Sequence, residues 1–367
     1  SNTPQDVTVH GDKGNDTIDV LATDDVLVTG DTETEIGIGD AYTITSVKEV
    51  AGDCCDISYI YDIGDQDFFF EGGDDSITVK DGDNDDQDHD YSDFEVYGDD
   101  LIDVNSGTAL LTGEYCVNQP TSVSADGGDV IISVEGGDDT ITVESFDYGS
   151  NDNDVRVYGD SGVSVPVISL IPIEKEDDGK DIFGFVFPGP IGLSVTGGDD
   201  SITVTGGDVI YVYGDNGLAD VQGGDVTVKD GDDIIDVTTD ESFAYVVGDS
   251  ELPLIFDKDT GLWIPADHVT IEEAGDDSIT VNAGQAVVYG DYEGGYDGGS
   301  ATPDPFNSPW DVPDPALFVP SDVEVGGDDT ITVTAEDAFV DGGGGDDEIT
   351  VTLTASNATI FGGAGDD

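Results

Sequence analysis

Short apolar runs separated by glycine and aspartate are the dominant pattern of this 367-residue chain. Within each run, apolar and polar residues alternate, which is the period of a β-strand with one buried face. Strands of four or five residues are too short to be stable alone, so we predict that they stack as parallel rungs on neighbouring repeats. The clearest succession runs through residues 201–204, 209–213, 226–229 and 234–237, and two such units are expected to make one coil.

Stacking would align the equivalent residues of successive repeats on one face. One inward-facing ladder then contains Ile77, Ile141, Ile202, Ile279, Ile331 and Ile349, and a second contains Val79, Val143, Val204, Val281, Val333 and Val351. The threonines between them are expected to line the solvent side: Thr78, Thr142, Thr203, Thr280, Thr332 and Thr350. This pattern predicts a core of isoleucine and valine.

Most of these strands follow a turn that contains glycine and two carboxylates. Glycine lets the backbone adopt positive φ, and paired aspartates offer hard oxygen ligands to a cation. We therefore interpret each copy as a carboxylate-lined turn that leads into a strand. The copies begin at Gly14, Gly72, Gly98, Gly136, Gly197, Gly231, Gly275, Gly326 and Gly342.

Two copies are longer and match a known repeat. Residues 342–350 read GGGGDDEIT and fit the nonapeptide G-G-x-G-x-D-x-U-x, in which U is a large apolar residue, at every fixed position. Residues 11–19 read GDKGNDTID and fit with one change, Asp12 in place of the second glycine. In these motifs the chain resembles the RTX family of secreted calcium-binding proteins.

The resemblance implies a parallel β-roll in which the turns of successive coils hold calcium between them. Carried over by motif position, the calcium-binding aspartates would be Asp16, Asp75, Asp100, Asp139, Asp200, Asp233, Asp277, Asp329 and Asp347, with Asp367 in the last half-motif. The preceding aspartates are further candidate ligands: Asp74, Asp138, Asp199, Asp232, Asp276, Asp328, Asp346 and Asp366. Because most copies keep only the second half of the motif, a strictly regular roll is not expected.

A second turn, VYGD or VVGD, recurs between the Gly-Asp-Asp turns. Its aspartates are candidate calcium ligands on another edge: Asp99, Asp160, Asp215, Asp249 and Asp291. Three insertions follow this turn, at residues 161–193, 250–268 and 292–323, so all three are expected to project from the same edge. Their apolar and aromatic residues either contact another surface, such as a glycan, or fold back over the core. The sequence leaves both alternatives open.

The composition favours a chain that needs cations to fold. A formal net charge of −77, from 85 acidic and 8 basic residues, opposes a compact state unless bound cations neutralise it. The chain has no basic patch for nucleic acid and no apolar run long enough for membrane insertion. Extracellular calcium sites have dissociation constants of roughly 0.1–1 mM, so we predict that the protein is extracellular and folds after secretion.

Catalysis and disulfide bonding receive little support from the sequence. No Gly-x-Ser-x-Gly elbow, H-E-x-x-H motif or phosphate-binding loop is present, and a pair of nearby carboxylates means little among 85 acidic residues. Cys54, Cys55 and Cys116 permit one disulfide and leave one thiol over. We do not expect an enzyme.

These observations predict one continuous all-β domain over residues 1–367, a parallel β-roll or β-helix solenoid stabilised by calcium with loop or hairpin insertions on one edge. The uncapped repeat at residues 361–367 and the apolar insertions predict self-association into a filament or layer, through the solenoid ends and through the insertions. The predicted function is an extracellular structural one, in a surface layer, filament or adhesin. The alternative, implied by the family resemblance, is the calcium-folding module of a larger toxin, hydrolase or adhesin exported by a type I system.

Overall fold

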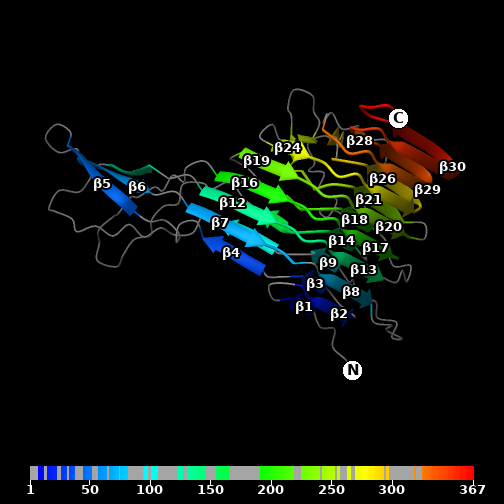
Figure 1. The fold of residues 1–367 in the computed structure, drawn as a ribbon, viewed down its shortest axis with the longest axis horizontal. Coiled ribbons are helices and arrows are strands. Elements are labelled where there is room, and N and C mark those ends of the chain that lie inside the picture. Colours follow the sequence, from blue (N-terminus) through cyan, green and yellow to red (C-terminus); the bar gives the residue numbers. More distant parts are fainter. Residues whose placement is uncertain are drawn as a thin grey trace.

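A computed structural model shows an all-β chain, with no helix in the part that it describes. Accordingly, none of the described segments is a helix able to cross a membrane. The strands lie side by side in several sheets (Figure 1). The described residues are 7–11, 15–22, 26–30, 33–37, 44–51, 57–63, 66–73, 75–81, 94–97, 101–105, 122–126, 130–144, 154–164, 191–207, 209–218, 225–239, 242–252, 254–256, 263–265, 269–292, 295–296, 318–319 and 325–367.

The largest sheet has 15 strands among these residues and consists of two rows. Row A contains β2 (Thr17–Ala22), β8 (Ser76–Asp81), β13 (Thr140–Glu144), β17 (Ser201–Thr205), β20 (Ile234–Thr238) and β25 (Ser278–Asn282). Row B contains β1 (Val7–His10), β3 (Val26–Thr29), β9 (Phe94–Tyr97), β14 (Asp154–Tyr158), β18 (Val209–Tyr213), β21 (Phe243–Val247) and β26 (Gln285–Tyr289). The long strands β29 (Thr330–Asp341) and β30 (Glu348–Phe361) run through both rows, so the sheet curls back on itself.

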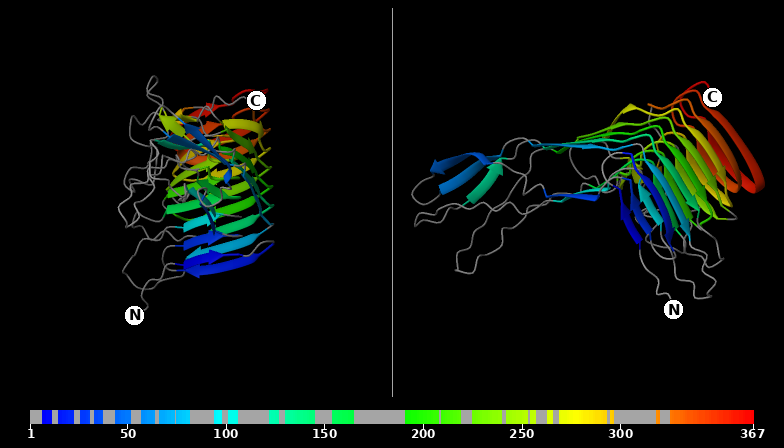
Figure 2. Two further views of the ribbon diagram at one scale, coloured as in Figure 1. Left: turned by 90° about the vertical axis from the view of Figure 1, so that its left-hand side faces the viewer. Right: turned by 60° about the horizontal axis from the view of Figure 1, so that its bottom comes forward.

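Strands within each row are parallel and pair in register. Ile202 of β17 pairs with Ile141 of β13 on one side and with Ile235 of β20 on the other. The strands follow one another along the stack from the blue N-terminal end to the red C-terminal end (Figure 2). This arrangement confirms the predicted parallel stacking of short strands.

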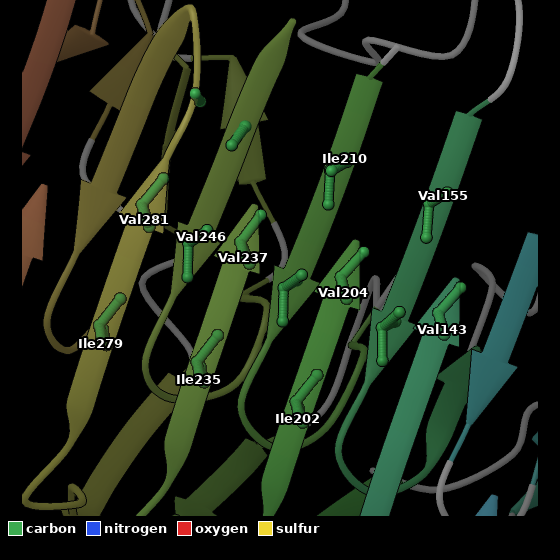
Figure 3. Packing of buried hydrophobic residues seen from close by; sticks show 14 of the residues in the cluster. Val143, Val155, Ile202, Val204, Ile210, Ile235, Val237, Val246, Ile279 and Val281 are labelled. Carbon is green, nitrogen blue, oxygen red and sulfur yellow. The ribbon is translucent and has the colours of Figure 1, made fainter. Parts of the chain in front are cut away.

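The core lies between rows A and B, where their inward side chains meet (Figure 3). The predicted isoleucine and valine ladders are buried from β8 to β29, and Ile349 and Val351 of β30 are partly buried. Row B supplies the facing layer, which includes Val155, Ile210 and Val246. Thr203, Thr280, Thr332 and Thr350 are exposed as predicted, whereas Thr78 and Thr142 are half-buried.

A third row of parallel strands was not predicted. Row C contains β7 (Gln66–Glu71), β12 (Val130–Glu135), β16 (Ile191–Thr196), β19 (Asp225–Lys229) and β24 (Val269–Glu273). In the middle of the chain, each repeat passes through rows C, A and B in turn, as β16, β17 and β18 do. The expectation of two strands per coil is therefore wrong there, because glycine spacing does not reveal which strands share hydrogen bonds. Among the described residues, no row C strand lies between β1 and β2, between β26 and β29 or between β29 and β30.

The remaining described strands form three small sheets. One is parallel and contains β4 (Glu33–Gly37), β10 (Leu101–Asn105) and β15 (Gly162–Ser164). Another contains β5 (Ile44–Ala51), β6 (Ile57–Ile63) and β11 (Ser122–Asp126), and the third is antiparallel, with β22 (Leu254–Phe256), β23 (Trp263–Pro265), β27 (Gly295–Tyr296) and β28 (Phe318–Val319). The predicted insertion 161–193 therefore begins one residue before β15 and ends inside β16, and both of these strands belong to parallel sheets.

Part of one insertion folds back onto the outer face of row B. That face carries a cluster of buried aromatic rings, including Tyr211, Tyr245 and Phe339. The ring of Phe318 in β28 lies 5.6 Å from the ring of Tyr245 and 6.2 Å from that of Phe339. The alternative in which insertions cover the body of the protein is confirmed at this point. Residues 165–190, 257–262, 266–268 and 297–317 of the insertions and the three cysteines lie outside the described residues.

Two adjacent isoleucines in β20 allow a direct test of the inward and outward faces. Ile235 is 1% exposed, whereas Ile234 is 59% exposed. We expect Ile235→Val to lower the free energy of unfolding by about 1 kcal/mol, because it removes a buried methylene. The control Ile234→Val should change it by less than about 0.5 kcal/mol. Urea unfolding of both variants in calcium would measure the difference, and equal effects would contradict the assignment of the two faces.

Candidate metal centre

The second aspartate of each Gly-Asp-Asp turn belongs to a buried ladder, here called the inner row. In this row, each backbone N–H donates to Oδ1 of the equivalent aspartate in the next repeat, over N···O distances of 2.6 to 3.4 Å. Between Asp75 and Asp347 these residues are at most 7% exposed. The inner row contains Asp16, Asp75, Asp139, Asp200, Asp233, Asp277, Asp329, Asp347 and Asp367.

The first aspartate of each pair forms a separate, exposed ladder, here called the outer row. Its hydrogen bonds run in the opposite direction, because each backbone N–H donates to Oδ1 of the aspartate in the preceding repeat, at 2.8 to 3.2 Å. The outer row contains Asp138, Asp199, Asp232, Asp276, Asp328, Asp346 and Asp366. Each predicted pair of ligands is therefore split between the interior and the solvent.

The aspartates of the VYGD turn form a third set, the corner row, at the end of the row B strands. Asp160, Asp215, Asp249 and Asp291 are at most 1% exposed. Backbone N–H groups of the facing turn donate to these carboxylates, as Gly275 does to Oδ1 of Asp249 at 2.9 Å and Gly327 to Oδ1 of Asp291 at 2.7 Å. The corner row is thus held by the backbone of the Gly-Asp-Asp turns.

Inner and corner rows converge in the middle of the chain. Ligand oxygens of Asp139, Asp160 and Asp200 lie within 4.8 Å of one another, and so do those of Asp200, Asp215 and Asp233. Each of these groups takes two carboxylates from successive inner-row positions and one from the corner row. The same pattern recurs one repeat later, so the groups form a series that shares Asp200.

Several oxygens in these rows are buried without a hydrogen-bond partner. Oδ2 is buried and makes no hydrogen bond in Asp200, Asp233, Asp249, Asp277, Asp329 and Asp347. An unsatisfied buried oxygen is costly, and an unpaired buried charge costs more. A cation bound by oxygen ligands would satisfy these atoms and neutralise their charge, so the residues present fit a hard metal ion.

The raised pKa values of the buried aspartates also favour a bound cation. Burial raises the pKa of the central inner and corner carboxylates well above the ordinary value, and neighbouring aspartates raise it further, at Asp200, Asp215, Asp233, Asp249 and Asp277. Burial also raises the pKa of Asp291 to about 8, that of Asp329 to about 10 and that of Asp347 to about 6. These groups are therefore stable in this arrangement only when a proton or a cation neutralises them.

Close contact between repeats explains the glycines at two positions of these turns. A Cβ on Gly231 would lie 1.9 Å from the carbonyl oxygen of Gly198, so the stacked turns leave no room for a side chain. A Cβ on Gly214 would lie 2.0 Å from Oδ2 of Asp233, so this glycine leaves room for the inner-row carboxylate. The sequence led us to expect positive φ as the reason for these glycines. Neither Gly214 nor Gly231 is among the described glycines with positive φ, which are Gly206, Gly207, Gly343, Gly345 and Gly363.

Asp230 is a buried acidic residue that the sequence pattern did not single out. It is 6% exposed and forms a third group with Asp215 and Asp249, whose ligand oxygens also lie within 4.8 Å of one another. The available signal was a break in the repeat, because residues 229–233 read KDGDD where the copies that begin at Gly72, Gly136, Gly197 and Gly326 have two glycines before the aspartates.

The structure brings together only some of the predicted ligands. The convergent groups among the described residues contain Asp139, Asp160, Asp200, Asp215, Asp233 and Asp249, together with Asp230. No outer-row aspartate belongs to them. Asp74, Asp99 and Asp100 lie outside the part of the chain that the structure describes.

Comparison of the chain with protein-family models, with curated proteins and with solved structures finds no match.

Proposed function

We propose that this chain is a calcium-stabilised parallel β-solenoid with an extracellular structural role. The observation that supports it most strongly is the convergence of buried inner-row and corner-row carboxylates, several with an oxygen that lacks a hydrogen-bond partner. Such an arrangement is unfavourable for the protein alone and favourable around a cation. Metal binding and folding would therefore be one coupled event.

The chemistry of the ligands favours calcium over other common metals. The three groups contain carboxylates alone, without the histidine or cysteine that zinc prefers. Each repeat of the series adds one inner-row and one corner-row carboxylate, whose two negative charges match one divalent cation. Calcium accepts six to eight oxygen ligands in flexible geometry, whereas magnesium requires near-ideal octahedral coordination. A series of carboxylates shared between neighbouring ions therefore favours calcium, because its coordination geometry is flexible.

The resemblance of residues 342–350 to the RTX nonapeptide and the net charge of −77 support an extracellular location. Outside the cell, calcium at about 1 mM would saturate sites of the weak class expected for such modules. In a low-calcium cytosol the same charges would keep the chain unfolded. The proposed role is that of a repeat segment in a surface layer, filament or adhesin, with self-association through the ends of the stack.

Circular dichroism during a calcium titration would test this function. In chelator at low ionic strength and neutral pH, we expect a coil spectrum. Calcium should produce a cooperative transition to β-structure, with a midpoint of roughly 0.1–1 mM. Magnesium at the same concentration is the control and should produce much less β-structure.

A chain that keeps its full β-structure after exhaustive removal of divalent ions at low ionic strength would contradict the proposal. So would a calcium titration that leaves the spectrum unchanged at every concentration.

A further inference from the structure

We propose that Asp215, Asp230 and Asp249 hold an additional calcium ion, at a site that the other described repeats lack. This inference rests on the proposed calcium-stabilised fold. The site lies outside the repeating series described above, because it combines two corner-row carboxylates with Asp230.

The site exists because Asp230 occupies a position that carries no carboxylate in neighbouring repeats. The N–H of Asp230 donates to the carbonyl of Glu273, and the N–H of Gly197 donates to the carbonyl of Lys229. Gly197, Asp230 and Ala274 therefore occupy equivalent positions in successive repeats. A Cβ on Gly197 would lie 1.6 Å from Oδ1 of Asp215. A side chain at this position therefore points at the corner row.

A second observation points to a ligand at this place. Oδ1 of Asp249 accepts a hydrogen bond from the N–H of Gly275 at 2.9 Å, while its Oδ2 is buried and has no hydrogen-bond partner. Asp249 and Asp215 are both 0% exposed. One oxygen of Asp249 is therefore held by the backbone, and the other remains for a cation.

Asp230 is positioned by two hydroxyl groups from successive repeats. The Ser250 hydroxyl donates to its Oδ1 and the Tyr292 hydroxyl donates to its Oδ2, each at 2.6 Å. Both hydroxyl residues are 0% exposed and directly follow a corner-row aspartate in the sequence. These two donors fix the orientation of both Asp230 oxygens beside Asp215 and Asp249. Ser250 and Tyr292 are positioning residues of this site.

The charge of Asp230 is not shared with any other group. Only Asp215 of this site is shared with the repeating series, whereas the group of Asp200, Asp215 and Asp233 shares both Asp200 and Asp215 with other groups. Three buried carboxylates around one divalent cation provide a high local negative charge. We therefore expect this site to bind calcium more tightly than the repeating sites do.

Calcium binding to the full chain would test the site, with Asp230→Gly as the main variant. Glycine is the residue of the equivalent position in the preceding repeat, Gly197, so the substitution should preserve the fold, which circular dichroism in saturating calcium would verify. Isothermal titration calorimetry should show one bound ion fewer than in the wild-type chain and the loss of the tightest phase. Asp236→Asn removes an exposed charge from β20 and should leave both quantities unchanged.

Tyr292→Phe tests the positioning role, because it removes only the hydroxyl. We expect the number of bound ions to stay the same and the affinity of the tightest phase to fall roughly tenfold. If Asp230→Gly does not fold, Asp230→Asn keeps the size of the side chain and should also lose the tightest ion. Unchanged stoichiometry and affinity in the Asp230 variants would overturn the inference while leaving the repeating series intact. A wild-type chain that binds no calcium would overturn the proposed function as well.

Discussion

In the absence of divalent cations, acidification should fold this chain rather than unfold it. The reason is the raised pKa of the buried carboxylates. A group whose pKa is higher in the folded than in the unfolded state stabilises the fold fully below its unfolded pKa, and this stabilisation is lost as the pH rises through the folded pKa. Asp200, Asp233 and Asp277 are of this kind, because burial raises the pKa of each.

The pH window follows from the individual groups. Their ordinary pKa is 3.8, and burial raises the pKa of Asp347 to about 6, that of Asp291 to about 8 and that of Asp329 to about 10. Stability contributed by these groups is therefore present in full below about pH 4 and is lost progressively between about pH 4 and pH 10. Acid denaturation of ordinary proteins has the opposite sign, because their paired carboxylates have lowered pKa values.

The measurement is far-ultraviolet circular dichroism of the chelated chain at about pH 5 and pH 8, in dilute solution because the isoelectric point is near 4.1. We expect β-structure at the lower pH and a coil spectrum at the higher one. The calcium-loaded chain, as the control, should be folded at both. A chelated chain that is unfolded at both values would show that protons cannot replace the cation, and one folded at both would show that no neutralisation is needed.

The alternation of buried and exposed residues along each strand also indicates which aspartate of the preceding turn is buried. Ile235 and Val237 face the core, so continuing the same alternation backwards places Asp233 inside and Asp232 with the exposed Ile234 outside. The inner and outer rows are therefore a continuation of the strand pattern into the turn. Motif comparison alone treated both aspartates of each pair as equivalent ligands, whereas the structure buries the inner row and exposes the outer row.

Other features depend on contacts that no local pattern encodes. Row C was missed because its strands have the same alternation as those of row A, and only hydrogen bonding distinguishes the rows. The convergence of Asp215 with Asp233 depends on how the corner turn of row B meets the Gly-Asp-Asp turn of row A, which is a question of three-dimensional distance. Asp230 lies beside the corner row because hydrogen bonding in row C places it at the position equivalent to Gly197.

Asp233→Asn should have opposite effects on the calcium-loaded and the metal-free chain. Asparagine keeps an oxygen that can accept the hydrogen bond from the N–H of Asp200, now 2.7 Å long, but it removes one of three carboxylates around a proposed ion. With calcium, we expect the free energy of unfolding to fall by about 3 kcal/mol or more, because a buried cation loses its compensating charge. Without metal, the same change removes a buried charge that burial and Asp277 both destabilise, so the fold should gain stability.

The neighbouring Asp232→Asn is the matched control, because Asp232 is exposed and belongs to none of the convergent groups among the described residues. It should change the calcium-loaded stability by less than about 1 kcal/mol. Urea unfolding in saturating calcium measures the first effect, and the pH midpoint of acid-induced folding in chelator, which should rise for Asp233→Asn, measures the second. If both variants lowered stability equally in calcium, the inner row would be no more important than the outer row. If Asp233→Asn lowered the pH midpoint, the buried charge could not be what opposes folding without metal.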